Sequence, residues 1–215
     1  MKDFSRTGLS LAVRSALIGT TVALALHGGQ ANAASRCYGF DALSLDETYP
    51  VGGGPIETDE ATVNVQTFLI GEEPPANPGA ELVRVLHSNL PSYTPPSIEL
   101  GTATLQVIPD VPLHTVTFDY AQSTGLDNRQ RQNFGVNGER LTELEGGLEQ
   151  LDGRVLGRVL FGGPAQVAFV ATPDSDTLPT WVRGTVTISA LGAGINGFAV
   201  GGHGSMLIDN VCLEW

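Results

Sequence analysis

Four acidic residues near the two cysteines of the chain have the chemistry of a metal-ion site. Asp41 follows Cys37 by four residues, and Asp209 precedes Cys212 by three. If the cysteines are bonded, both carboxylates come from neighbouring terminal strands at one end of the fold. Ca²⁺ binds six to eight oxygens from carboxylates, carbonyls and water, whereas acids in turns commonly accept backbone hydrogen bonds. The sequence predicts a structural calcium site and leaves the turn interpretation open; the candidate ligands are Asp41, Asp46, Glu47 and Asp209.

A tryptophan beside two carboxylates is the second group with recognisable chemistry. The segment Thr172–Trp181 contains Asp174 and Asp176. An exposed indole ring can stack on the apolar face of a sugar while carboxylates bind its hydroxyls. Trp181 has the same strand parity as Arg183, so we expect both side chains to face solvent. The predicted ligand-binding residues are therefore Trp181, Asp174 and Asp176, and the alternative is a buried Trp181 next to an ordinary turn.

Catalytic signatures are weak in this chain. The run Gly202-His203-Gly204-Ser205 has glycines and a serine, but it is not the G-x-S-x-G turn of serine hydrolases. The histidines are far apart, with no H-x-x-x-H or H-E-x-x-H spacing. We expect no enzymatic activity and no cofactor besides the predicted calcium, and we keep a secreted hydrolase as the third alternative.

The first 33 residues have the three parts of a secretory signal. Basic residues precede the apolar run Ser15–Leu26, and Ala31-Asn32-Ala33 forms an A-x-A cleavage site. The apolar run is too short to span a bilayer comfortably. The sequence therefore predicts cleavage after Ala33, leaving residues 34–215 as one exported, soluble domain, in the periplasm or outside a bacterial cell.

The charge balance excludes several kinds of partner. The full chain has 11 basic and 23 acidic residues, and removing three and one of these with the signal leaves 8 and 22, net −14. A strongly acidic surface disfavours binding to nucleic acid or to anionic membranes. Two cysteines in an exported protein most often form one disulfide. We therefore expect a Cys37–Cys212 bond and no membrane span in the mature chain.

Short alternating segments with frequent turn signals indicate an all-β fold. About ten strands are predicted, and the clearest is Leu113–Gln122, in which apolar and polar residues alternate. Glu139–Leu151 has helical spacing of leucines, but Gly146-Gly147 argues against a stable helix. This pattern predicts a two-sheet antiparallel β-sandwich, and its length and joined ends favour a jelly roll.

The C-terminal segment is expected to close the fold. Ile195–Val200 and Ser205–Leu213 are predicted as two strands of a hairpin, with the turn at Gly201–Gly204. The Cys37–Cys212 bond would then place the first strand beside the last one.

Motifs at both ends and in the middle of the chain carry a resemblance to a known group. They are Cys37, Phe40, Asp41, Leu43, Tyr49, Val51 and Gly52, then Asn137–Glu139, Leu151–Gly153 and Gly157, and finally Ile195, Phe198, Val200–Gly202 and Leu207–Cys212. On these residues the chain resembles secreted bacterial jelly-roll proteins that look like carbohydrate-binding modules of the galactose-binding-like type. The resemblance implies a jelly roll, and modules of this type often hold calcium between the terminal strands.

The leading hypothesis is an exported, non-catalytic β-sandwich that recognises extracellular glycans. The second is a structural or adhesive surface protein that assembles through protein–protein contacts with the same fold. The sequence does not identify the glycan, the oligomeric state or a role for Glu57–Pro112.

Overall fold

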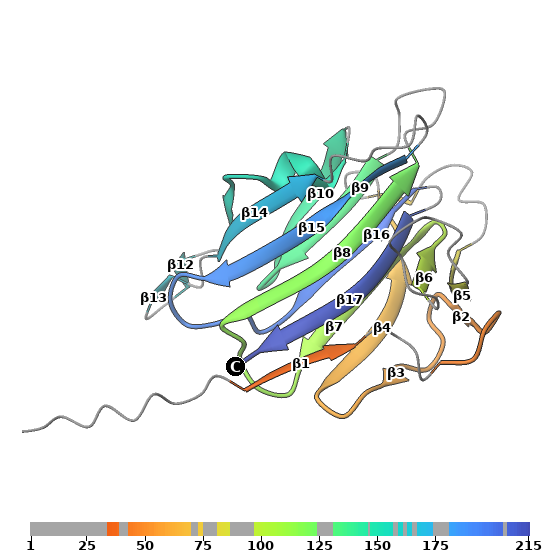
Figure 1. Ribbon diagram of the computed structural model, residues 1–215, viewed down its shortest axis with the longest axis horizontal. Coiled ribbons are helices and arrows are strands. Elements are labelled where there is room, and N and C mark those ends of the chain that lie inside the picture. The colour runs from red at the N-terminus through yellow and green to blue at the C-terminus, as the bar shows by residue number, and fades with distance from the viewer. Residues whose placement is uncertain are drawn as a thin grey trace, which may run out of the picture. The chain divides into compact units, whose positions relative to one another are not determined.

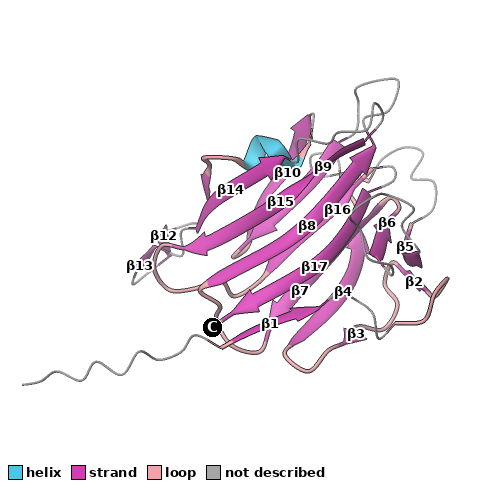
Figure 2. Ribbon diagram, in the orientation of Figure 1, coloured by secondary structure: helices cyan, strands magenta, loops and turns pink. Residues whose placement is uncertain are grey.

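The computed structural model describes residues 34–38, 43–69, 73–74, 81–86, 97–123, 131–145, 147–156, 159–160, 163–164, 167–173, 181–203 and 206–215. The chain divides into two units, Met1–Asn32 and Ala33–Trp215, and all described residues belong to the second. Among the described residues of this unit, the regular elements are strands and one short 3₁₀ turn (Figure 2). Within the described part of the chain, no helix is long and apolar enough to cross a membrane.

The strands form two antiparallel sheets that lie one in front of the other in Figure 1. The larger sheet has nine strands in the order β11-β14-β15-β8-β17-β6-β5-β2, with β1 also paired to β17. Its strands are β11 (Val155–Leu156), β14 (Val167–Pro173), β15 (Trp181–Ala190), β8 (Thr115–Ser123), β17 (Met206–Glu214), β6 (Ser97–Leu100), β5 (Leu82–Leu86), β2 (Thr48–Pro50) and β1 (Ser35–Tyr38).

The smaller sheet has six strands in the order β10-β9-β16-β7-β4-β3. They are β10 (Glu139–Glu145), β9 (Arg131–Val136), β16 (Phe198–Gly202), β7 (Ala103–Pro109), β4 (Ala61–Thr67) and β3 (Ile56–Glu57). A separate two-stranded ribbon pairs β12 (Val159–Leu160) with β13 (Gly163–Pro164). The two main sheets confirm the prediction of an antiparallel β-sandwich.

The core lies between the sheets and is built from the alternate residues of each strand that point inward. Phe118 of β8 stacks on Phe198 of β16 with ring centroids 6.2 Å apart, so the two sheets meet through aromatic rings. A second pair, Phe134 of β9 and Phe169 of β14, meets edge to face at 5.2 Å. Interdigitation of side chains from two inner faces is what holds a sandwich together.

The central strands pair as nested partners along the chain. β9 pairs with β10, β8 with β15, β7 with β16 and β6 with β17. The two members of each pair share a sheet, and the sheet changes from β6 to β7, from β7 to β8 and from β8 to β9. The earlier strands β6–β8 and the later strands β15–β17 therefore pair with each other around the same core.

The predicted C-terminal hairpin is wrong, because β16 and β17 belong to different sheets. Gly201 and Gly202 are not turn residues but the end of β16, where they pair with β7 and β9. A Cβ atom at Gly201 would collide with the hydroxyl of Thr104 on β7, so glycine is needed there for close packing within the sheet.

The segment Glu139–Leu151, for which the sequence argues against a stable helix, contains β10 and then one 3₁₀ turn, Leu148–Leu151. Gly147 precedes this turn at a φ of 132°, which side-chain-bearing residues rarely adopt. Leu148 and Leu151 are fully buried, so the turn packs against the core. The evenly spaced leucines therefore divide between two elements: Leu141 and Leu144 belong to β10, and Leu148 and Leu151 to the single turn.

The two ends of the domain are joined as predicted. β1 runs antiparallel to β17 with Cys37 directly opposite Cys212, and the two cysteines form a disulfide. The backbone N–H of Trp215 also donates to the carbonyl of Ala34 at 3.0 Å. The terminal strands are therefore adjacent, and the prediction of the disulfide is confirmed.

Candidate functional site

One half of the outer face of the larger sheet is a polar, half-exposed surface. In the paired segments Thr115–Asp119 of β8 and Thr185–Ser189 of β15 the inward residues are buried, while the alternate positions carry hydroxyl groups and one carboxylate. In register across the two strands, Thr115 lies opposite Ser189, Thr117 opposite Thr187, and Asp119 opposite Thr185. We refer to these six residues together with Asn210 of β17 as the hydroxyl face.

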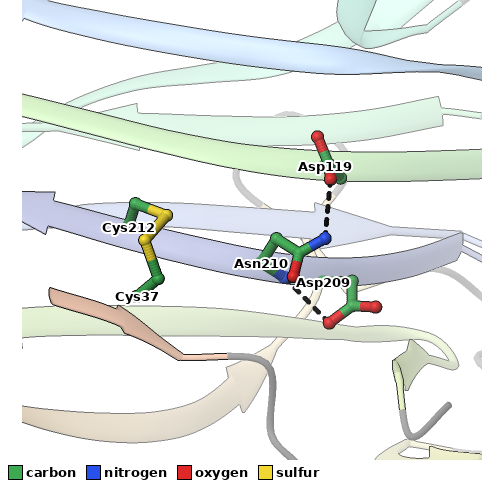
Figure 3. Close-up of a disulfide and its surroundings, with 5 residues drawn as sticks. All are labelled: Cys37, Asp119, Asp209, Asn210 and Cys212. Carbon is green, nitrogen blue, oxygen red and sulfur yellow. Dashed lines mark hydrogen bonds between the residues drawn. A yellow bond between two sulfur atoms is a disulfide. The ribbon is translucent and has the colours of Figure 1, made fainter. Parts of the chain in front are cut away.

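Asp119 is the centre of the hydroxyl face, because both neighbouring strands donate hydrogen bonds to it. The hydroxyl of Thr185 donates to Asp119 Oδ1 at 2.7 Å, and Asn210 Nδ2 donates to Asp119 Oδ2 at 2.8 Å. Figure 3 shows Asn210 reaching from β17 to this carboxylate. The two donors fix the orientation of the carboxylate, which retains lone pairs for a further partner.

A β-bulge positions Asn210. Asp209 lies opposite Asp119, but Cys212 lies opposite Thr117, so β17 has one residue more than β8 in this interval. Asn210 has a φ of 49°, in the left-handed region that asparagine tolerates better than most residues. Its backbone N–H donates to Asp209 Oδ1 at 2.8 Å. A bulge of this kind re-aims a side chain, and here it points the amide of Asn210 toward Asp119.

Asp209, a predicted calcium ligand, is almost completely buried, with 1% of its surface exposed. On one side of β17, residues 206–208 pair with β6 and residues 211–214 pair with β1. Asp209 lies at the break between these partners, where its Oδ2 accepts a hydrogen bond from the hydroxyl of Ser97 at 3.3 Å. These contacts are those of a carboxylate that satisfies polar groups at a strand junction.

The other predicted calcium ligands do not join Asp209 in one cluster. Asp46 is exposed at a φ of 62° in a turn and forms an ion pair with Arg84 at 3.2 Å. Glu47 is exposed and accepts a hydrogen bond from the backbone N–H of Ser44 at 3.3 Å. Asp41 lies outside the described residues. Among the residues that are described, no group of three or more His, Cys, Asp or Glu side chains could hold a metal ion.

Glu47 also affects its neighbour Tyr49. Burial raises the pKa of the Tyr49 hydroxyl above 10.0, and a hydrogen bond to Glu47 and the negative charge of Glu47 raise it further. This hydroxyl therefore stays protonated through the physiological range and acts as a hydrogen-bond donor.

Trp181 is the first residue of β15 and is partly buried opposite Ser123. The expectation that Arg183 faces solvent is wrong, because only 3% of its surface is exposed although it has the parity of the outer face. Ala121 and Leu207 occupy the same row and are also buried. This covered row separates Trp181 from Asp119.

The remaining predicted ligand residues, Asp174 and Asp176, lie outside the described residues, so the sugar site at Trp181 stays a prediction. The serine of the glycine-rich run, Ser205, lies outside them as well. His203 is described, and its ring lies 5.9 Å from that of Phe68.

Sequence reasoning missed the hydroxyl face as a site. The two T-V-T runs at 115–117 and 185–187 are visible in the sequence, but only the strand register shows that they lie side by side. The role of Asn210 could not be predicted, because the direction of its side chain depends on the β-bulge and no local sequence pattern marks the extra residue.

The fold and this surface together define a disulfide-closed β-sandwich with a polar sheet face. Comparisons with protein-family models, with curated proteins and with solved structures find no match for the chain.

Proposed function

We propose that the protein is an exported, non-catalytic β-sandwich that binds extracellular glycan through the hydroxyl face. The observation that carries the proposal is the Asp119 carboxylate, fixed between Thr185 and Asn210 on a half-exposed sheet surface. Carbohydrates present many hydroxyl groups, each of which both donates and accepts. A charge-assisted hydrogen bond to a fixed carboxylate is stronger than one between neutral groups.

The rigidity of the surface supports the same function. Residues Thr117 and Thr187 are neighbours on paired central strands, whose backbones are held on both sides. Groups ordered before binding lose less conformational entropy when the ligand arrives. A flat, preorganised array of hydroxyl, carboxylate and amide groups therefore suits a polyhydroxylated ligand.

The order of the strands supports the resemblance to galactose-binding-like modules. We infer a jelly roll from the nested pairs β9/β10, β8/β15, β7/β16 and β6/β17, because a long hairpin rolled around a core produces this order. A fold of this kind does not by itself specify a ligand, so the hydroxyl face and not the topology carries the function. The disulfide supports export, since such bonds persist in oxidising compartments.

Glycan binding is tested with an array of neutral and acidic oligosaccharides, followed by calorimetric titration of any ligand found. Thr187→Val removes one hydroxyl of the hydroxyl face at constant shape, and Asp119→Asn removes the charge. We expect Thr187→Val to weaken binding several-fold and Asp119→Asn to weaken it further. The matched control is Thr62→Val, which makes the same change on the smaller sheet. Equal affinity of Thr187→Val and Thr62→Val would refute the site, and no binding to any glycan would refute the function.

An exposed aliphatic patch favours the second candidate, a surface protein that assembles through protein contacts. Val155, Val170 and Leu191 are 53%, 55% and 52% exposed, and Val170 lies opposite Thr187 on the neighbouring strand. Clustered exposed aliphatic side chains mark interaction surfaces more often than scattered ones do. Val155→Asp tests this candidate, because Val155 lies two strands from the hydroxyl face, where a charge should abolish a protein contact and leave glycan binding in place.

A further inference from the structure

The middle of the smaller sheet is uncharged in a strongly acidic protein. The three strands β4, β7 and β16 are neighbours in this sheet and contain no Asp, Glu, Lys or Arg at any position. The whole chain carries 23 acidic and 11 basic residues, a net charge of −12. Two copies of such a protein repel each other over most of their surface, and an uncharged face reduces that repulsion.

The outward side chains of these strands form an amide-rich surface, which we call the amide face. Asn64 and Gln66 of β4 and Gln106 of β7 are half-exposed, and Asn64 lies opposite Gln106. Gln66 Nε2 donates to Gln106 Oε1 at 2.5 Å. Next to Gln106 on β16 is the half-exposed Ala199, whose small side chain makes this part of the surface low, whereas the neighbouring pair Gly201 and Thr104 is buried.

We propose that the amide face is the contact between two copies of this chain. A primary amide carries two donors and one acceptor, so one amide can pair with an identical amide from a second copy. Carboxylates cannot pair in this way while charged. In a two-fold dimer the same patch meets itself, so a self-complementary, uncharged surface is what such an interface requires.

An aliphatic side chain adds an apolar contact at one end of the amide face. Ile108 of β7 points outward and is 41% exposed. Burial of this side chain in the contact would remove apolar surface from water, which favours association. The dimer then combines a small apolar contribution with amide–amide hydrogen bonds, without a charged pair.

The size of the face predicts a reversible dimer. Three strands at a spacing of about 4.8 Å, two of them about 23 Å long and β16 about 17 Å long, span roughly 300 Å². Stable complexes bury about 800 Å² on each partner. We therefore expect association that depends on protein concentration, with monomer and dimer in exchange.

The experiment is sedimentation equilibrium of the purified protein over a range of concentrations from micromolar to millimolar. Asn64→Asp with Gln106→Glu keeps the shapes of both side chains and places four charges in the dimer interface. We expect the dissociation constant to rise at least tenfold and high salt to recover part of the loss. The matched control, Thr117→Asp with Ser189→Asp, adds the same charge to the larger sheet and should leave association unchanged.

Each outcome decides the proposal. Thermal melting of both double variants establishes that they are folded, and the concentration series of the unmodified protein needs no variant at all. A protein that is monomeric at every concentration would overturn the proposal, as would equal loss of association in the two double variants. Loss of association with Val155→Asp but not with the amide-face variant would assign the contact to the aliphatic patch. The proposal does not depend on glycan binding.

Discussion

Removal of the Cys37–Cys212 disulfide should destabilise the domain by several kcal/mol. The bond closes a loop with a sequence separation of 175 residues. The chain-entropy relation gives about 5 kcal/mol for a loop of this size, and measured losses from native disulfides are about 2–5 kcal/mol. We expect a loss of stability within that range. Strand β1 pairs with β17 through four residues only, and Ser35–Cys37 are exposed, so few other contacts hold β1 in place once the disulfide is removed.

The measurement is urea unfolding of the unmodified protein and of Cys37→Ser with Cys212→Ser, which leaves no free thiol. The double variant should unfold at lower urea, with a slope at least as large, because its unfolded chain is no longer cross-linked and exposes more surface. Reduction of the unmodified protein should reproduce the change. These comparisons separate the effect of the bond from the effect of the two serines.

Two results would refute this reasoning. Thiol counting on denatured, unreduced protein should find no reactive thiol, and two thiols would end the claim of a bond. A double variant within about 0.5 kcal/mol of the unmodified protein would show that closing the ends contributes nothing to stability.

Three other predictions concern single features. Burial raises the pKa of Glu149 above 4.5, so its favourable contribution is complete below that pH and is lost as pH rises through the higher folded-state pKa. In urea unfolding, the stability of Glu149→Gln relative to the unmodified protein should therefore rise above pH 4.5 and level off once Glu149 is ionised in the folded state, and a difference that does not change with pH would contradict this. Trp181→Ala should change stability by only about 1 kcal/mol while abolishing glycan binding if the predicted site exists, whereas a loss of about 3 kcal/mol would mark the ring as core. If Asp41 and Asp209 share calcium, a chelator should lower the melting temperature by several degrees and added calcium should restore it; identical melting curves would favour the turn interpretation.

The fold class was predictable because its signals are local. Alternation in Leu113–Gln122 gives the faces of one strand, and two cysteines near the ends give the pairing of the terminal strands. The assignment of each strand to a sheet was not predictable in the same way. Gly201 and Gly202 fit a hairpin turn and a tightly packed strand equally well, and only the pairing of β16 with β7 and β9 decides between them.

The candidate site was less predictable than the fold. Parity placed Arg183 on the outer face correctly, but parity does not tell whether another part of the protein covers that face. Asp209 was recognised as a functional candidate from its position near Cys212, whereas its contact with Ser97 depends on a break between strands 112 residues apart in sequence. Asp119 gained importance only through partners 66 and 91 residues away.

The position of β17 determines when the larger sheet can be completed during synthesis. The last nine-residue strand lies in the interior of its sheet and pairs with β1, β6 and β8. Until β17 leaves the ribosome, these three strands lack their shared partner, so the long-range contacts that β17 makes form late. A stop codon before β17 would leave three exposed strand edges, which favour aggregation.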